Sequence, residues 1–389
     1  MSYELHLRQY DRTGVLKKAV LQPLWARYSE SVDGQEPLVF ALNYESEAAV
    51  DFDEFDILQV MIRNKELGIQ DVDGGFVGAF VGLLRDWDIE TDEDGLTFIQ
   101  FKAPNEKHIL SWRSVLWYTG VANRSTFSNV PAETIMKTLV QYNFTADASV
   151  ANDRLREGNL STGMGIDITI AADLARGNNL SRAFMGGNIL PIMQRLAEQA
   201  GGDFSLTWQG GNDWEFEYHP GQLGTDKSTG SERVLFSILN NTMRNPRLVR
   251  KGARATAAIS GGQGEGLARA MTEVEGADYA LDYDLETFVD ARREATEEGR
   301  IFKGLEQLEP MGISAELTFD VLQTGNQFYS PVAVTGRKTY RAGNLVTAVY
   351  AGVEQVRKIE RVEVEWKVPS NEDAFQVSLT TKEVIYGGS

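Results

Sequence analysis

Alternating apolar and polar residues dominate both ends of the chain. Near the start, Tyr3, Leu5 and Leu7 alternate with polar neighbours, and residues 361–367 (RVEVEWK) alternate without a break. Successive side chains of a strand point to opposite faces, so this period of two predicts strands with one packed face. Further strands are expected at residues 37–44, 57–62, 215–218, 234–238, 253–259, 271–274, 332–334, 345–349, 356–368 and 374–384.

The clearest hairpin is predicted over residues 76–101. Two apolar strands, at 78–90 and 96–103, flank a polar stretch that ends in Asp94-Gly95. An Asp-Gly pair between two strands is a strong signal for a tight turn. The first hundred residues therefore predict an antiparallel barrel or sandwich.

The pattern changes to a helical period in the middle of the chain. A helix is expected from Pro131, with Ile135, Leu139 and Val140 on one face, because proline is favoured at a helix start. A second helix at 190–200 ends at Gly201-Gly202 and leads into a strand at 203–208. Residues 147–185, rich in Gly, Asn and Ser, predict long surface loops. Residues 284–299 form either a helix capped by Asp284 or a strand at 286–290 followed by a short helix.

This order of elements predicts a mainly β protein with an α+β insert. We expect two related antiparallel β-barrel domains that flank a helical or mixed domain. The predicted domains are residues 1–108 (N-terminal β-barrel), 109–212 (helical or mixed) and 213–389 (second β-barrel, with a helical or mixed insertion near 284–308).

Charge and composition exclude several classes of function. The 389 residues contain 38 Lys and Arg against 56 Asp and Glu, a net charge of −18. Such a chain is a poor candidate for binding nucleic acid or an anionic membrane, because basic residues provide most of the affinity for phosphate groups. The absence of cysteine excludes disulfides and thiolate sites. No signal peptide is evident, and the longest apolar stretches are too short to span a bilayer.

Glycine-rich and acidic motifs offer only weak chemical signals. Residues 261–266 (GGQGEG) follow a predicted strand, but Leu267 stands where a dinucleotide loop requires its third glycine, so a turn is expected. The pairs Asp86/Asp88 and Asp282/Asp284 could each present two carboxylates to a divalent cation. In so acidic a chain such pairs arise by chance, and we predict neither a metal site nor a cofactor.

The three histidines, His6, His108 and His219, are far apart in the sequence. None has a second histidine three or four residues away, so a histidine metal site is not indicated. His6 alternates with the apolar residues of its strand and is expected to face solvent. No catalytic residue is predicted.

Two charge blocks are the candidate interaction sites. The simplest interpretation is that both are solvated surfaces; the alternative is that they meet across an interface or, for the acids, line a channel that repels DNA. The acidic candidates are Glu45, Glu47, Asp51, Asp53, Glu54 and Asp56, and the basic candidates are Arg244, Arg247, Arg250, Lys251 and Arg254.

Several stretches, in this order over most of the chain, resemble the baseplate-hub or tail-tip hub proteins of bacteriophage tails, especially those of siphophages. They are residues 112–118, 124–140, 192–206, 257–266 with 269–275, 288–292 and 340–348. The resemblance implies a ring-forming hub: a homotrimer whose six barrels match a sixfold tail tube to a threefold spike or fibre. It also implies distal-tail or tail-tube ring proteins, a central spike or fibre and a tape-measure protein as partners, with DNA only in transit.

The sequence therefore favours a structural, non-enzymatic virion protein of the phage tail tip, assembled in the host cytoplasm and without membrane insertion. The alternative is a carbohydrate- or cell-wall-active protein, either a hydrolase that uses a carboxylate pair or a glycan-binding module. A carboxylate pair would have to be chosen from 56 acidic residues, and nothing in the sequence selects two.

Overall fold

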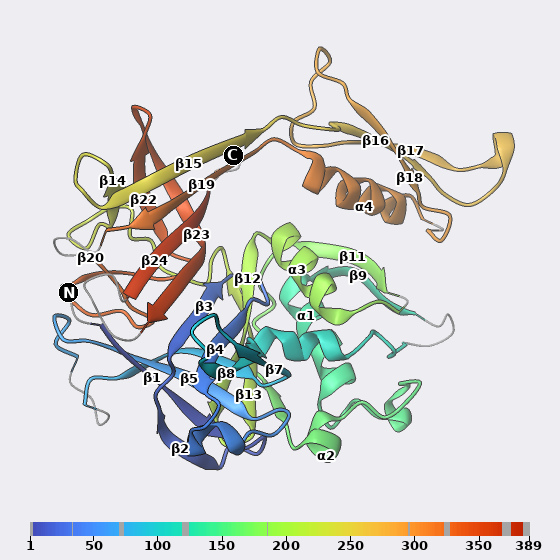
Figure 1. The fold of residues 1–389 in the computed structure, drawn as a ribbon. Coiled ribbons are helices and arrows are strands. Elements are labelled where there is room, and N and C mark those ends of the chain that lie inside the picture. Colours follow the sequence, from blue (N-terminus) through green and yellow to red (C-terminus); the bar gives the residue numbers. More distant parts are fainter. Residues whose placement is uncertain are drawn as a thin grey trace.

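The computed structural model describes residues 3–32, 34–69, 74–118, 124–184, 186–294, 296–322, 327–367 and 375–383. Two β-rich layers, a mixed middle region and a projecting lobe make up the molecule (Figure 1). Short 3-10 helices lie between the main elements: η1 (Glu47–Val50), η2 (Glu106–Trp112), η3 (Val150–Asn152), η4 (Gly266–Ala268) and η5 (Glu309–Met311).

The largest sheet joins strands from the two ends of the chain. Its ten strands run in the order β15 (Met243–Lys251), β19 (Ser314–Val321), β24 (Phe375–Glu383), β23 (Val353–Lys367), β3 (Trp25–Ser31), β4 (Pro37–Asn43), β8 (Thr97–Pro104) and β7 (Asp86–Thr91), with β22 (Leu345–Tyr350) and β14 (Leu235–Ser237) branching from β23. The junction is the antiparallel pair β23–β3, which runs from Arg361 opposite Ser31 to Lys367 opposite Trp25. One hydrogen-bonded layer thus contains strands from the N-terminal and the C-terminal parts of the chain.

A four-stranded antiparallel sheet packs against this layer. Its order is β2 (Leu16–Leu21), β1 (Tyr3–Tyr10), β5 (Ile57–Asn64) and β6 (Val77–Leu83). Leu7 and Val60 of this sheet share one buried core with Tyr28, Phe319 and Val364 of the large sheet. A short parallel pair, β20 (Gln327–Tyr329) and β21 (Lys338–Tyr340), adds Tyr329 and Tyr340 to the same core.

The middle region is built around two helices, α1 (Ala132–Phe144) and α3 (Ile189–Ala200). It also contains a short helix, α2 (Leu160–Met164), and a three-stranded sheet in the order β10 (Asp167–Ile170), β13 (Asp213–Pro220) and β12 (Gly202–Gly210). The antiparallel pair β9 (Ser125–Pro131) and β11 (Asn179–Phe184) completes it. Asn188 caps α3 by accepting a hydrogen bond from the Leu190 N–H, and Gly201 ends the helix with a φ of 65°. The apolar faces of both helices are buried in a second core.

The lobe comprises residues 252–294 and 296–313 and projects from the large sheet on β15 and β19 (Figure 1). Its sheet has the order β17 (Met271–Glu275), β16 (Ala257–Gly261) and β18 (Glu286–Asp290), and helix α4 (Glu297–Leu308) packs on one face. In the described part of the lobe, Ala255, Ala258, Val274, Val289 and Leu308 form the buried hydrophobic cluster. The lobe is therefore a thin two-layer unit whose second sheet face has no helix on it.

The prediction of a mainly β protein with an α+β insert is confirmed. The expected barrels are not closed: the strands that the structure describes form open sheets that pack face to face. Residues 284–299 follow the second interpretation, a strand at Glu286–Asp290 and then a helix. Other expectations were wrong, since the stretch 147–185 contains α2, β10 and β11 as well as loops, and residues 332–334 are not a strand.

Candidate interaction surfaces

Strand β15 carries the basic block predicted from the sequence. Arg244, Arg247, Arg250 and Lys251 are exposed on this strand, and exposed Arg254 follows it. The strand is the edge of the ten-stranded sheet. Within the described chain, the acid nearest to these five groups is Asp320, 4.0 Å from Arg244. Apart from this long ion pair, the basic groups of the strand have no ion-pair partner in the described chain.

The edge of β15 is also protected against pairing with another strand. Pro246 lacks a backbone donor, and Asn245 before it has a φ of 51°. The register with β19 shifts between Arg244 and Arg247, as at a β-bulge. Proline, bulges and charged side chains are the features by which natural edge strands avoid edge-to-edge association. The strand thus presents its charged side chains rather than a free row of backbone groups.

Most of the acidic block has partners within the chain. The Lys17 ammonium lies 3.4 Å from Asp51, 3.0 Å from Asp53 and 3.1 Å from Asp56. The Asp56 side chain is only 1% exposed and accepts a 2.6 Å hydrogen bond from Gln9 Nε2. Its role is internal, because it holds the loop before β5 against β1. The sequence pattern could not predict these ion pairs, since Lys17 lies on β2, more than thirty residues before the acids that it contacts.

Of the remaining members of the acidic block, one forms an ion pair within the chain and two are exposed to solvent. Glu54 lies 3.4 Å from Arg85. Glu45 and Glu47 lie before and at the start of η1 and are exposed. They are the two members of the block that remain candidates for contact with another molecule or with a channel.

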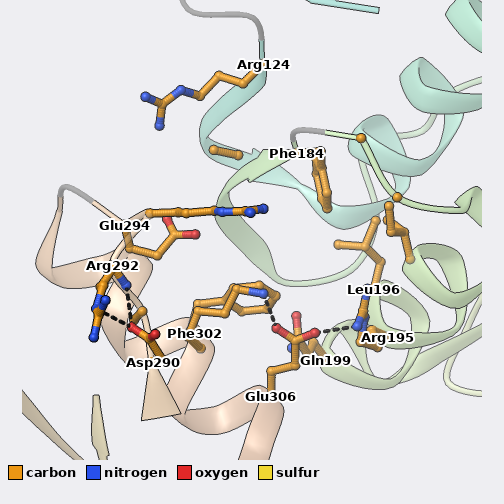
Figure 2. Close-up of a pocket in the computed structure, with 17 residues that line it drawn as sticks. Arg124, Phe184, Arg195, Leu196, Gln199, Asp290, Arg292, Glu294, Phe302 and Glu306 are labelled. Atoms are coloured by element: carbon orange, nitrogen blue, oxygen red, sulfur yellow. Dashed lines mark hydrogen bonds and ion pairs between the residues drawn. The ribbon is translucent and has the colours of Figure 1, made fainter. Parts of the chain in front are cut away.

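Helix α4 of the lobe contacts the middle region around a cavity of about 560 Å³ (Figure 2). Glu306 forms ion pairs with Arg195 of α3 and with Lys303, 2.6 Å away. The Arg182 guanidinium of β11 lies 3.6 Å from the centre of the Phe302 ring. Burial lowers the pKa of Arg182 to about 10, and the attraction of Glu306 opposes that shift. A cation over an aromatic ring and a bridging carboxylate thus hold the lobe against α3.

These contacts predict that Phe302→Ala loosens the lobe. The substitution removes the ring under the Arg182 guanidinium, a contact worth about 1–2 kcal/mol when desolvated. We expect a larger radius of gyration by small-angle X-ray scattering, with the melting temperature of the rest of the chain unchanged. Ile301→Ala, on the same helix but away from the cavity, is the matched control and should leave the radius unaltered. An unchanged radius for Phe302→Ala would show that the cation–ring contact does not hold the lobe.

Comparison with known proteins identifies the family. Residues 47–379 match the family described as Siphovirus ReqiPepy6 Gp37-like protein, and this range covers most of the chain. The chain belongs to the Gp37-like family. No curated protein matches it.

Solved structures show that the Gp37-like chain has the fold of phage tail proteins. The tail protein from Neisseria meningitidis MC58 is 12% identical with a TM-score of 0.54, and the match covers 98% of this chain and 97% of that one. The 43 kDa tail protein of prophage MuSo2 from Shewanella oneidensis is also 12% identical, with a TM-score of 0.51 and 97% of each chain covered. At this identity the match concerns the fold, over the whole length. The resemblance to phage-tail hub proteins inferred from the sequence is confirmed.

The histidines of this Gp37-like chain lie on separate elements: His6 on β1, His108 on η2 and His219 on β13. The expectation that His6 faces solvent was wrong, because its side chain is only 7% exposed and its ring centre lies 4.4 Å from that of Phe76. Strand β1 is paired on both edges, by β2 and β5, and most of its residues are buried, so strict alternation fails there.

The other sequence motifs show ordinary structural roles. Asp88 lies 2.9 Å from Lys102, which is directly opposite Asp86 on the neighbouring strand. Asp282 and Asp284 lie in an exposed loop of the lobe. Among the residues that the structure describes, no group of three or more His, Cys, Asp and Glu could hold a metal ion. Across the same residues, no helix is long and apolar enough to cross a membrane.

The glycine-rich stretch 261–266 is a turn between β16 and β17, as expected. Gly264 has a φ of 99°, and a Cβ there would come within 2.3 Å of the Ala268 carbonyl oxygen. Arg269 fills the concave side by donating to the carbonyl oxygens of Gly261 and Gly262, at 3.0 and 3.2 Å. Backbone carbonyls and a guanidinium therefore occupy the place where a phosphate-binding loop would present free N–H groups.

Proposed function

We propose that the chain is a structural hub protein of a phage tail tip or baseplate. In this role it forms a trimeric ring that adapts the sixfold tail tube to a threefold central spike or fibre, and DNA passes through its centre. The observation that carries the proposal is the tail-protein fold over the entire chain, in a member of the Gp37-like family. Its mechanism is geometric and requires no catalytic group.

The proposed organisation assigns a role to each part of the chain. Residues 1–108 and 213–389 supply the two β-rich units of each protomer, so that three copies present six, and residues 109–212 brace them. The shared sheet through β3 and β23 supports a fixed angle between the two β-rich units, because ladder hydrogen bonds connect them directly. Exposed Glu45 and Glu47 suit a channel wall that repels DNA phosphates.

The proposed partners are a second and third copy, the tail-tube or distal-tail ring, the spike or fibre and the tape-measure protein. Each is a protein surface, with DNA in transit and no membrane insertion. We place the chain in the virion, after assembly in the host cytoplasm. The alternative, a hydrolase of the cell wall, requires a carboxylate pair. Glu198 and Glu309 share a hydrogen bond, and burial together with this contact raises the pKa of Glu309 to about 8, but neither residue lines the cavity beside α4.

The decisive experiment is the solution mass of the purified chain, by mass photometry over a concentration series. We expect a species of three times 43.2 kDa and ring-shaped particles in negative stain. The tail-tube protein of the same phage is then added to the sample. A chain that stays monomeric at every concentration and also ignores the tube protein would overturn the proposal.

A further inference from the structure

The lobe exposes an acidic sheet face with an apolar centre. The register of β17–β16–β18 places nine side chains on the face opposite α4: Met271, Glu273, Glu275, Gly261, Ile259, Ala257, Asp290, Phe288 and Glu286. Phe288 is 55% exposed and Met271 51% exposed, although both are large apolar residues. These two residues lie on the outer strands of the lobe sheet, on either side of half-buried Ile259 of β16. Exposed apolar side chains beside charged ones are typical of a protein interface.

Three of the four acidic side chains on this face have no basic partner in the described chain, although the Arg269 guanidinium lies on the face, 5.2 Å from the centre of the Phe288 ring. Glu273, Glu275 and Glu286 have no ion pair with a described basic residue, whereas Asp290 is paired with Arg269 at 3.0 Å and with Arg292 at 3.4 Å. Acidic residues outnumber basic ones by thirteen to six between residues 252 and 313. The lobe therefore carries a strong excess of negative charge next to exposed apolar residues.

The lobe turns this face away from its own chain. Helix α4 lies between the lobe sheet and the middle region, where Phe302 and Glu306 make their contacts with Arg182 and Arg195 (Figures 1 and 2). The opposite face of the sheet is consequently directed outward. Met271 and Phe288 are therefore open to contact with another molecule.

Strand β15 has the complementary chemistry. Arg247 and Lys251 lie on one face of the strand and Arg250 on the other, beside Leu248, which is 45% exposed, so charged side chains flank the outer edge of the strand on both sides. Charged rims with a matching apolar centre are the usual composition of a specific interface. The lobe face and β15 are exposed at the same time in one chain, so neither of them covers the other within a protomer.

We infer that the acidic sheet face of the lobe docks on the basic strand β15 of a second copy of this chain. Two different surfaces meet, so the contact is heterologous, and repeated contacts of this kind close into a ring or continue as a filament. The inference rests on the proposed ring and names the surfaces that close it. Phe288 and Met271 pack against Leu248 of the neighbour, and Glu273, Glu275 and Glu286 pair with its arginines and lysine.

Engineered cysteines test the contact directly, because the chain contains no cysteine of its own. A chain with both Phe288→Cys and Leu248→Cys is oxidised at high protein concentration and analysed on a non-reducing gel. We expect disulfide-linked species that end at a trimer without free thiols, as a closed ring requires. Phe288→Cys combined with Val353→Cys, at an exposed site on another strand, is the control and should give little product.

Charge reversal tests the role of the ionic rim. Reversing the acids (Glu273→Lys, Glu275→Lys, Glu286→Lys) or the bases (Arg247→Glu, Arg250→Glu, Lys251→Glu) in the double-cysteine chain should lower cross-linking at least about tenfold. Both sets in one chain restore every contact and should recover the trimer. An equimolar mixture of the two singly reversed chains should give dimers and open chains with free thiols but no closed trimer, because an odd ring leaves one like-charged contact.

The outcomes separate this inference from the proposed function. Cross-linking no greater than in the control overturns the lobe–strand contact, and a trimer measured by mass in the same sample would leave the hub proposal standing. Cross-linking into open chains longer than three copies would support the contact and overturn the trimeric ring. Charge reversal without effect on cross-linking would overturn the electrostatic pairing on which the inference depends.

Discussion

Val364→Asp is expected to unfold both β-rich parts of the molecule together. Val364 is fully buried on β23, directly opposite Tyr28 of β3 and Val377 of β24. A carboxylate at this position has no basic partner in the core, and burying an unpaired charge costs about 4 kcal/mol or more. Because β3 and β23 are neighbours in one sheet, the loss should spread to strands from both ends of the chain.

Limited proteolysis combined with thermal unfolding measures this effect. The variant should show new cleavage sites in both 25–43 and 353–383 and a large fall in melting temperature. Val353→Asp is the matched control, since Val353 lies on the same strand but is 52% exposed, and it should change the stability by less than about 0.5 kcal/mol. If residues 25–43 stayed resistant to proteolysis in Val364→Asp, the two β-rich parts would be shown to fold as separate units.

Regular periodicity made the strongest elements predictable. The helix at 190–200 and the alternating strand at 361–367 lie within α3 and β23, because each packs one face on a core and has standard end signals. Pairing between β3 and β23 could not be predicted, since nothing in the sequence brings residues more than three hundred positions apart together.

The predicted strand 78–90 shows where the reasoning from alternation failed. It is two strands, β6 and β7, in two different sheets. Leu83 and Leu84 at the junction are both buried, Leu83 in the core of the middle region and Leu84 in the core of the large sheet. A chain that passes from one core to another needs consecutive apolar residues at the junction. If a single strand is assumed, the same two leucines are read as part of that strand, and the junction is missed.

The candidate surfaces were only partly predictable for a related reason. The basic block is contiguous in sequence, so it was found, but its strand β15 was missed because Arg and Pro hide the strand pattern. The acidic face of the lobe was not found at all. Its members come from three strands, and only the register places Glu273 beside Ile259 and Phe288.

Glu133→Gln is expected to destabilise the middle region by about 3–5 kcal/mol. Glu133 is fully buried in α1, with its Oε1 2.6 Å from Lys137 Nζ. Arg176 binds the same carboxylate through two parallel 2.9 Å contacts and donates to the Tyr218 carbonyl oxygen at 2.7 Å. The neutral amide would leave the nearly buried Lys137 ammonium without its counter-charge.

The pKa of Glu133 gives the same interaction a pH dependence of defined sign. Burial opposes ionisation, but hydrogen bonds from Arg176 and Lys137 lower the pKa from 4.5 to about 2. An acid with a lowered pKa in the folded state stabilises it above pH 4.5, and that stabilisation is lost as the pH falls from about 4.5 to about 2. The shift corresponds to about 3 kcal/mol, in the range expected for the substitution.

Urea unfolding of the two proteins at pH 7 and at pH 3 measures both effects. The free energy of unfolding of the parent should approach that of Glu133→Gln at pH 3, because the carboxyl group of the unfolded parent, with a pKa of 4.5, is then mostly protonated. Glu93→Gln is the control, because that side chain is exposed in the turn between β7 and β8, and the substitution should cost less than about 0.5 kcal/mol. Glu133→Gln combined with Lys137→Met removes the unpaired Lys137 ammonium and should recover much of the free energy of unfolding. Equal stability of Glu133→Gln and the parent at pH 7 would show that the buried cluster does not hold α1 in place.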